Sequence, residues 1–145
     1  HRDILVEDWR MRAMGSNSFR RHTPTMGTGV RMVNSQDIVI QGCSFMDEAE
    51  AGQMSGASLL ELEDCRRVQI NGCQFIDGAP CGIDVLRGRN ISIVGCMVTE
   101  TREAPVGNAG MRFAGEGAGN LLANNTVECP AGKPTELAAE SQVAT

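Results

Sequence analysis

One short pattern recurs along the chain and limits the folds that it can adopt. The pattern is an apolar residue, any residue, a second apolar residue, two further residues, Cys or Asn, any residue and a third apolar residue. It is found in DIVIQGCSFMD (37–47), RVQINGCQFID (67–77) and NISIVGCMVTE (90–100), with looser copies in NLLANNTVEC (120–129) and ILVEDWRM (4–11). Copies that recur along a whole chain indicate a solenoid in which each copy forms one coil.

Aligning the copies predicts which side chains stack on successive coils. The first predicted set of columns joins Ile38, Ile40, Cys43 and Phe45 to Val68, Ile70, Cys73 and Phe75, then to Ile91, Ile93, Cys96 and Val98, and then to Leu122, Asn125 and Val127, with Ile4, Val6, Trp9 and Met11 preceding them. A second set, about ten residues earlier in each copy, joins Val30 and Met32 to Leu60 and Leu62, Ile83 and Val85, and Met111 and Phe113. Alternation with a period of two predicts strands, and strands this short must pair with their equivalents on the next coil. The predicted fold is therefore all-β, a right-handed parallel β-helix of about five coils whose N-terminal coil is incomplete.

The segments ISIVGCMV and LLANNTV resemble the coil repeat of the pectate-lyase-like superfamily, which often has the form I-x-I-x-x-N-x-I. The resemblance covers about residues 4–129, and the chain departs from it by having Cys at 43, 73 and 96 where Asn is usual. The resemblance implies a parallel β-helix that binds or processes a polymeric carbohydrate. The lyases of this superfamily use Arg or Lys together with Ca²⁺-bound carboxylates on one face of the β-helix. The longer lyase signatures Asp-Pro-His-Asp, Gly-His-Gly and Arg-Ile-Lys are absent from the sequence.

Composition supports a thin core and narrows the range of partners. Aromatic residues make up 3 % of the chain, which suits a narrow solenoid core better than a thick globular one. The net charge of −5 and the pI near 5.0 make nucleic acid an unfavourable partner. No apolar run approaches the ~20 residues of a membrane span, so membrane insertion is not expected.

The repeats predict one β-helix domain over 1–130, followed by a tail over 131–145 that matches no repeat. We expect the tail to be disordered or to form a short helix over the open end. The copy at 4–11 lacks an upstream partner strand, so we expect the chain to be the C-terminal part of a longer protein or a processed product. Its partners would then be a glycan and either the remainder of that chain or further copies of it, in an extracellular or cell-envelope location.

Six cysteines raise the question of disulfide bonds. Cys43, Cys73 and Cys96 should stack ~4.8 Å apart on successive coils, with parallel Cα–Cβ bonds that leave the Cβ atoms farther apart than in a disulfide. We expect them to be buried free thiols. A bridge between Cys65 and Cys81 stays open as an alternative.

The first candidate site is a column of carboxylates, Asp47, Asp77 and Glu100, each two residues after the last apolar position of its coil. Carboxylates at ~4.8 Å steps repel one another unless a cation, a basic side chain or a proton compensates them. The functional hypotheses are a Ca²⁺ site, which makes Ca²⁺ the only expected cofactor, or an acid/base pair acting on a sugar. The alternative is that the side chains diverge and are solvated separately.

The second candidate is an outward row formed by Arg31, Glu61, Asp84 and Arg112. The favoured interpretation is a series of cross-strand ion pairs. The alternative is a catalytic pair, Glu61 with Asp84, at the ~5 Å separation of retaining glycosidases.

The third candidate is a basic loop containing Arg20, Arg21 and His22. Arginine binds carboxylates through a two-pronged fork, which suits an acidic polysaccharide as substrate. The same loop is also able to neutralise Asp47 if it folds over the acidic column.

Two functions follow from these observations. The first is binding or processing of a polymeric carbohydrate along one face by a lyase-like or hydrolase-like scaffold; whether it is an enzyme stays open. The second is a non-catalytic structural or adhesive segment, such as a stalk or tailspike. Long loops at 12–29, 46–57 and 99–109 favour a groove and hence the first function.

Overall fold

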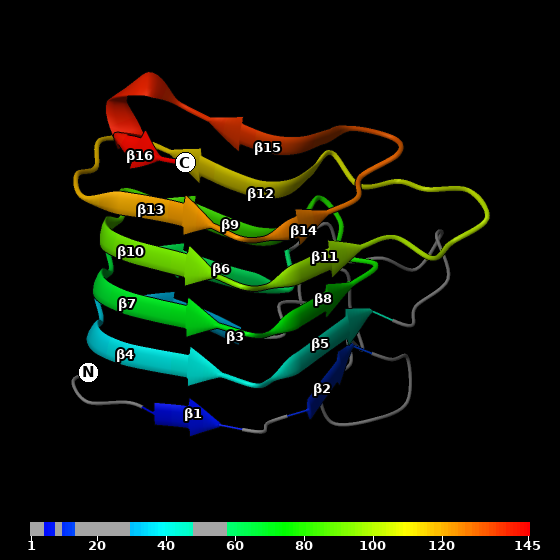
Figure 1. The fold of residues 1–145 in the computed structure, drawn as a ribbon, viewed down its shortest axis with the longest axis horizontal. Coiled ribbons are helices and arrows are strands. Elements are labelled where there is room, and N and C mark those ends of the chain that lie inside the picture. Colours follow the sequence, from blue (N-terminus) through cyan, green and yellow to red (C-terminus); the bar gives the residue numbers. More distant parts are fainter. Residues whose placement is uncertain (1–4, 8–9, 14–29, 48–57) are drawn as a thin grey trace.

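The chain winds into a stack of flat coils, as the sequence predicted (Figure 1). The structure is a computed structural model that describes residues 5–7, 10–13, 30–47 and 58–145. Every strand pair within it is parallel and joins equivalent segments of neighbouring coils. The prediction of a parallel β-helix is therefore confirmed.

Three sheets run along the axis of the stack. Sheet A contains β1 (Leu5–Glu7), β4 (Gln36–Gln41), β7 (Arg66–Asn71), β10 (Arg89–Val94), β13 (Asn120–Ala123) and β16 (Val143–Ala144). Sheet B contains β2 (Arg10–Ala13), β5 (Ser44–Asp47), β8 (Gln74–Ile76), β11 (Met97–Thr99) and β14 (Thr126–Val127). Sheet C contains β3 (Val30–Val33), β6 (Leu60–Glu63), β9 (Cys81–Leu86), β12 (Ala109–Ala114) and β15 (Lys133–Leu137).

The observed register matches the predicted columns. In sheet A, Val6 pairs with Ile40, Ile40 with Ile70, Ile70 with Ile93, and Ile93 with Leu122. Sheet B pairs Met11 with Phe45, Phe45 with Phe75, Phe75 with Val98, and Val98 with Val127. Sheet C joins Val30, Leu60, Ile83 and Met111 in the same way. The predicted members Ile4 and Trp9 lie outside the described residues.

The inward columns form one narrow core. Ile70, Ile83, Ile91 and Ile93 are fully buried, and burying each such side chain contributes roughly 1.5–3 kcal/mol. The rings of Phe45 and Phe75 stack with centroids 4.8 Å apart and an interplanar angle of 2°. Because both rings come from the same position of adjacent coils, the coil spacing itself produces this stack.

The coils turn at corners where one residue takes a left-handed conformation. The corner between sheets A and B uses Gly42, Gly72, Gly95 and Asn124, with φ values from 55° to 66°. Glycine and asparagine tolerate this conformation. The turn geometry therefore explains why glycine or asparagine precedes each inward-pointing Cys or Asn. The short connection between sheets C and A has a left-handed residue at each of its two ends. The first end is occupied on successive coils by Asn34, Asp64, Arg87 and Gly115, and the second by Asp37, Arg67, Asn90 and Gly119.

The cysteine stack is confirmed as reduced and buried, and the Cys65–Cys81 bridge is not formed. The Cys96 thiol lies 3.6 Å from the Ile70 carbonyl oxygen of the preceding coil. In the next coil Asn125 takes over the same position, accepting the Cys96 N–H at 2.9 Å and donating to the Ile93 carbonyl at 3.0 Å. A hydrogen bond to the Cys96 sulfur and burial raise the pKa of the Cys73 thiol, so this thiol stays protonated at neutral pH.

The C-terminal tail adds a further partial coil to the stack. Strand β15 pairs with β12, a short 3-10 helix (Ala139–Ser141) follows, and β16 pairs with β13. The tail is therefore neither disordered nor a plain helix, because its backbone finds partners on the exposed edges of the last full coil. Within the described residues, no helix has the length and apolar character needed to cross a membrane.

Candidate functional site

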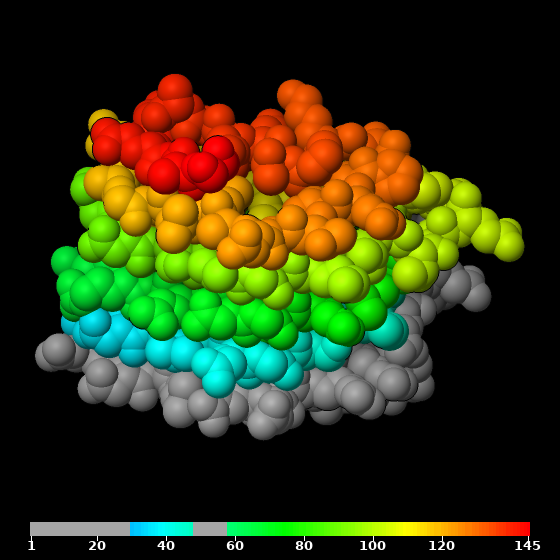
Figure 2. All heavy atoms as spheres, viewed as in Figure 1, coloured from blue at the N-terminus to red at the C-terminus, as the bar shows by residue number. Residues whose placement is uncertain are grey.

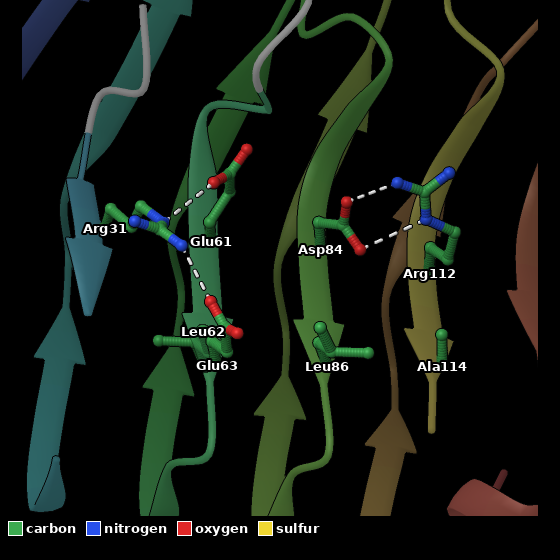
Figure 3. Close-up of a pocket in the computed structure, with 8 residues that line it drawn as sticks. All are labelled: Arg31, Glu61, Leu62, Glu63, Asp84, Leu86, Arg112 and Ala114. Carbon is green, nitrogen blue, oxygen red and sulfur yellow. Dashed lines mark hydrogen bonds and ion pairs between the residues drawn. The ribbon is translucent and has the colours of Figure 1, made fainter. Parts of the chain in front are cut away.

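The outer face of sheet C carries a row of charged side chains over a shallow hollow of about 410 Å³ (Figure 3). The row crosses four strands in register, because Arg31 pairs with Glu61, Glu61 with Asp84, and Asp84 with Arg112. These residues alternate with the buried side chains of the same strands and therefore point outward. Leu62, Glu63, Leu86 and Ala114 complete the lining.

Both ends of the row form the ion pairs that the sequence predicted. Arg31 Nε lies 3.4 Å from a Glu61 carboxylate oxygen. Arg112 donates through Nε to Asp84 Oδ1 at 3.1 Å and through a terminal nitrogen to Asp84 Oδ2. This two-pronged hydrogen bond raises the pKa of the Arg112 guanidinium.

The candidate catalytic carboxylates turn to opposite sides (Figure 3). Glu61 faces Arg31 and also accepts the Ser58 backbone N–H at 3.1 Å. Asp84 faces Arg112 on the other side of the row. Each carboxylate is thus engaged by the arginine on its own side of the row.

A second network of ion pairs borders the hollow at the corner after β6. Arg31 donates to Glu63 at 2.7 Å, and Arg87 donates to the other oxygen of Glu63 at 3.0 Å. Arg87 also holds Asp64 with hydrogen bonds of 2.6 and 3.0 Å. The hydrogen bond from Arg87 lowers the pKa of the Asp64 carboxyl.

The acidic column is compensated by residues of its own loops. Asp77 accepts hydrogen bonds from the Thr101 backbone N–H at 2.5 Å and the Thr101 hydroxyl at 2.6 Å. The Arg102 guanidinium donates to the Asp77 carbonyl at 2.7 Å and the Asp47 carbonyl at 3.3 Å. It also lies 3.9 Å from the Asp47 carboxylate, with 13 % of the Arg102 side chain exposed.

The third member of the column, Glu100, closes the loop that follows β11. Its two oxygens accept the backbone N–H groups of Val106 and Gly107, each at 3.0 Å. This loop projects beyond the stacked bands of the coils (Figure 2). Across 30–47 and 58–145, no three or more His, Cys, Asp or Glu side chains converge in a way that would hold a metal ion.

The sequence did not identify the part that Arg102 plays. The only signal was a basic residue two positions after Glu100 in a loop adjoining the column. The basic loop that we expected to bind substrate or to neutralise Asp47, with Arg20, Arg21 and His22, lies outside the described residues.

Comparison with known proteins adds one finding to this geometry. A family model described as a right handed beta helix region matches residues 11–127. A search of curated proteins gave no match to the chain.

Proposed function

The chain belongs to the family of right-handed β-helix regions, and from this premise we propose that it binds a polymeric carbohydrate along sheet C without cleaving it. The observation that carries the proposal is the in-register row Arg31, Glu61, Asp84 and Arg112 over an open hollow. A parallel sheet repeats one outward position every ~4.8 Å, so a polymer lying along the axis meets a charged side chain at each coil.

The chemistry of the row suits sugar hydroxyls. Carboxylates accept hydrogen bonds and guanidinium groups donate them. The row therefore offers acceptors at its centre, from Glu61 and Asp84, and donors at its two ends, from Arg31 and Arg112. The described aromatic side chains, Phe45, Phe75 and Phe113, are buried and offer no stacking surface. Binding would therefore rely on polar contacts and weaken as salt rises.

We expect no cleavage because each candidate catalytic carboxylate is already engaged by an arginine. General acid catalysis needs a carboxyl that carries a proton near neutral pH, which requires an apolar setting or an uncompensated like charge. Glu61 is instead engaged by Arg31 and Asp84 by Arg112, and the two carboxylates turn to opposite sides rather than towards one shared substrate atom.

A glycan array tests the proposal, followed by assays for reducing sugars and unsaturated uronates on any glycan that binds. We expect binding without product, with the affinity reduced at least tenfold by Arg112→Gln and unchanged by Gln69→Ala on the outer face of sheet A. Formation of product would show a processing enzyme. If no glycan binds, the segment is structural or adhesive, which was the second function inferred from the sequence.

A further inference from the structure

Two exposed arginines stand apart from the others in the structure. Among the arginine side chains of 30–47 and 58–145, most are hydrogen-bonded to a carboxylate or a carbonyl: Arg31, Arg67, Arg87, Arg102 and Arg112. Arg66 and Arg89 are exposed, and within these ranges neither side chain has a hydrogen bond or an ion pair.

Arg66 and Arg89 are also register partners on adjacent coils, at the first positions of β7 and β10. Their backbones are fixed by hydrogen bonds from Arg66 N to the Ser35 carbonyl at 3.0 Å and from Arg89 N to the Cys65 carbonyl at 3.1 Å. Equal charges at directly opposite positions of two strands are destabilising. The fold therefore places two arginines at directly opposite positions of neighbouring strands, and within 30–47 and 58–145 neither side chain is paired with a carboxylate.

Among the residues that the structure describes, the neighbours of the pair do not supply a compensating negative charge. The same column continues to Gln36 on one side and Ala118 on the other, and both are uncharged. Acidic residues in the flanking turn columns are engaged by other arginines. Arg67 holds Asp37 with hydrogen bonds of 2.5 and 3.1 Å, and Arg87 holds Asp64.

We propose that Arg66 and Arg89 together bind a phosphate group, either inorganic phosphate or the phosphate monoester of a small molecule. A phosphate carries a charge of about −1.5 to −2 near pH 7, which matches the two positive charges. Each guanidinium offers N–H donors in a planar fork suited to phosphate oxygens, and two forks on coils ~4.8 Å apart can share one tetrahedral anion.

This site is separate from the hollow of sheet C and does not rest on the carbohydrate proposal. Its residues begin the strands of sheet A and line neither that hollow nor the acidic column. Carbohydrate binding along sheet C and phosphate binding at Arg66 and Arg89 can therefore each be abolished by substitution without affecting the other.

The test is a titration of the chain with inorganic phosphate and with glucose 6-phosphate at constant ionic strength, followed by ³¹P NMR and by thermal unfolding. The variants are Arg66→Gln and Arg89→Gln, and the matched control is Lys133→Gln, which removes one exposed positive charge elsewhere. We expect a saturable ³¹P shift and a rising melting temperature for the wild type and the control. Each arginine variant should lose at least tenfold in affinity.

Comparing the two ligands identifies the source of the phosphate. Equal affinity means that inorganic phosphate suffices, and tighter binding of the ester means that the site also contacts its carbon skeleton. Without ligand at low salt, both arginine variants should unfold at or above the wild-type temperature, because repulsion has been removed. A linear, unsaturated ³¹P response, or equal affinity for wild type and Arg66→Gln, would overturn the proposal.

Discussion

Asn120 offers the sharpest test of how the coils are held together. Asn120 directly precedes Leu121, which pairs with Ser92, so Asn120 lies opposite Ile91. On the earlier coils the same column holds the apolar residues Val68 and Ile38. The Asn120 side chain is buried, with 2 % of the residue exposed. The side chain accepts the Ile91 N–H at 2.9 Å and donates to the carbonyls of Gly88 at 3.0 Å and Ser141 at 2.7 Å.

Replacing Asn120 by Ala should therefore be strongly destabilising. An unsatisfied buried N–H costs roughly 1–3 kcal/mol, and each lost hydrogen bond to a carbonyl about 1 kcal/mol. Together these terms give a loss of about 3–5 kcal/mol, a large part of the 5–15 kcal/mol typical of a domain. Because Ser141 belongs to the C-terminal partial coil, the amides of β16 should also lose hydrogen-exchange protection.

Urea unfolding followed by far-ultraviolet circular dichroism measures the loss. The matched control is Asn124→Gly, since Asn124 is exposed and has a φ of 55° that glycine adopts without strain. We expect the control to stay within about 0.5 kcal/mol of the wild type. If Asn120→Ala costs under 1 kcal/mol, the three hydrogen bonds do not stabilise the stack as argued.

Four further predictions concern the register, the thiols (two of the four) and the acidic column. Ile70→Asp buries a charge between Ile40 and Ile93 and should abolish cooperative unfolding, whereas Glu61→Gln should cost under ~1 kcal/mol; equal melting temperatures would contradict the inward and outward assignment. Burial raises the pKa of Cys81 from 9.0 to about 11, so its contribution to stability is complete below pH 9 and lost as pH rises towards 11. The denatured chain without reductant should show at least the three thiols of Cys43, Cys73 and Cys96 in a titration, and a count of zero would refute the stack. Because Arg102 and Thr101 engage the acidic column, Ca²⁺ up to the ten-millimolar scale of weak extracellular sites should leave the wild-type melting temperature unchanged. A rise that Asp77→Asn removes would instead support the hypothesis of a Ca²⁺ site.

The fold could be predicted because its pattern is repeated and local. Alternating apolar residues such as Ile38 and Ile40 determine which face turns inward, and the left-handed turn before each Cys keeps the copies in step. The same reasoning placed Arg31 beside Glu61 and Asp84 beside Arg112, because outward residues follow from inward ones.

The features that the sequence did not predict depend on how individual non-repeating segments fold. Arg102 reaches the column because its loop folds back across two coils, and no repeat encodes that path. The tail strand β15 has little apolar alternation and is positioned by backbone pairing with β12. Asn120 did leave a signal, since it replaces an aliphatic residue in an otherwise apolar column, but its partner Ser141 was visible only in three dimensions.

The columns of left-handed residues at the corners have a consequence for how such a chain can evolve in length. Each coil turns at equivalent positions, so cutting out residues 66–88 would join Cys65 to Arg89 and bring β10 directly against β4 in the register already used by β7. Ile91 would then lie over Ile38, and Val98 over Phe45, without an inward or outward reversal. The length of the molecule is thus a quantity that in-frame duplication or deletion can alter by whole coils while the cross-section stays the same.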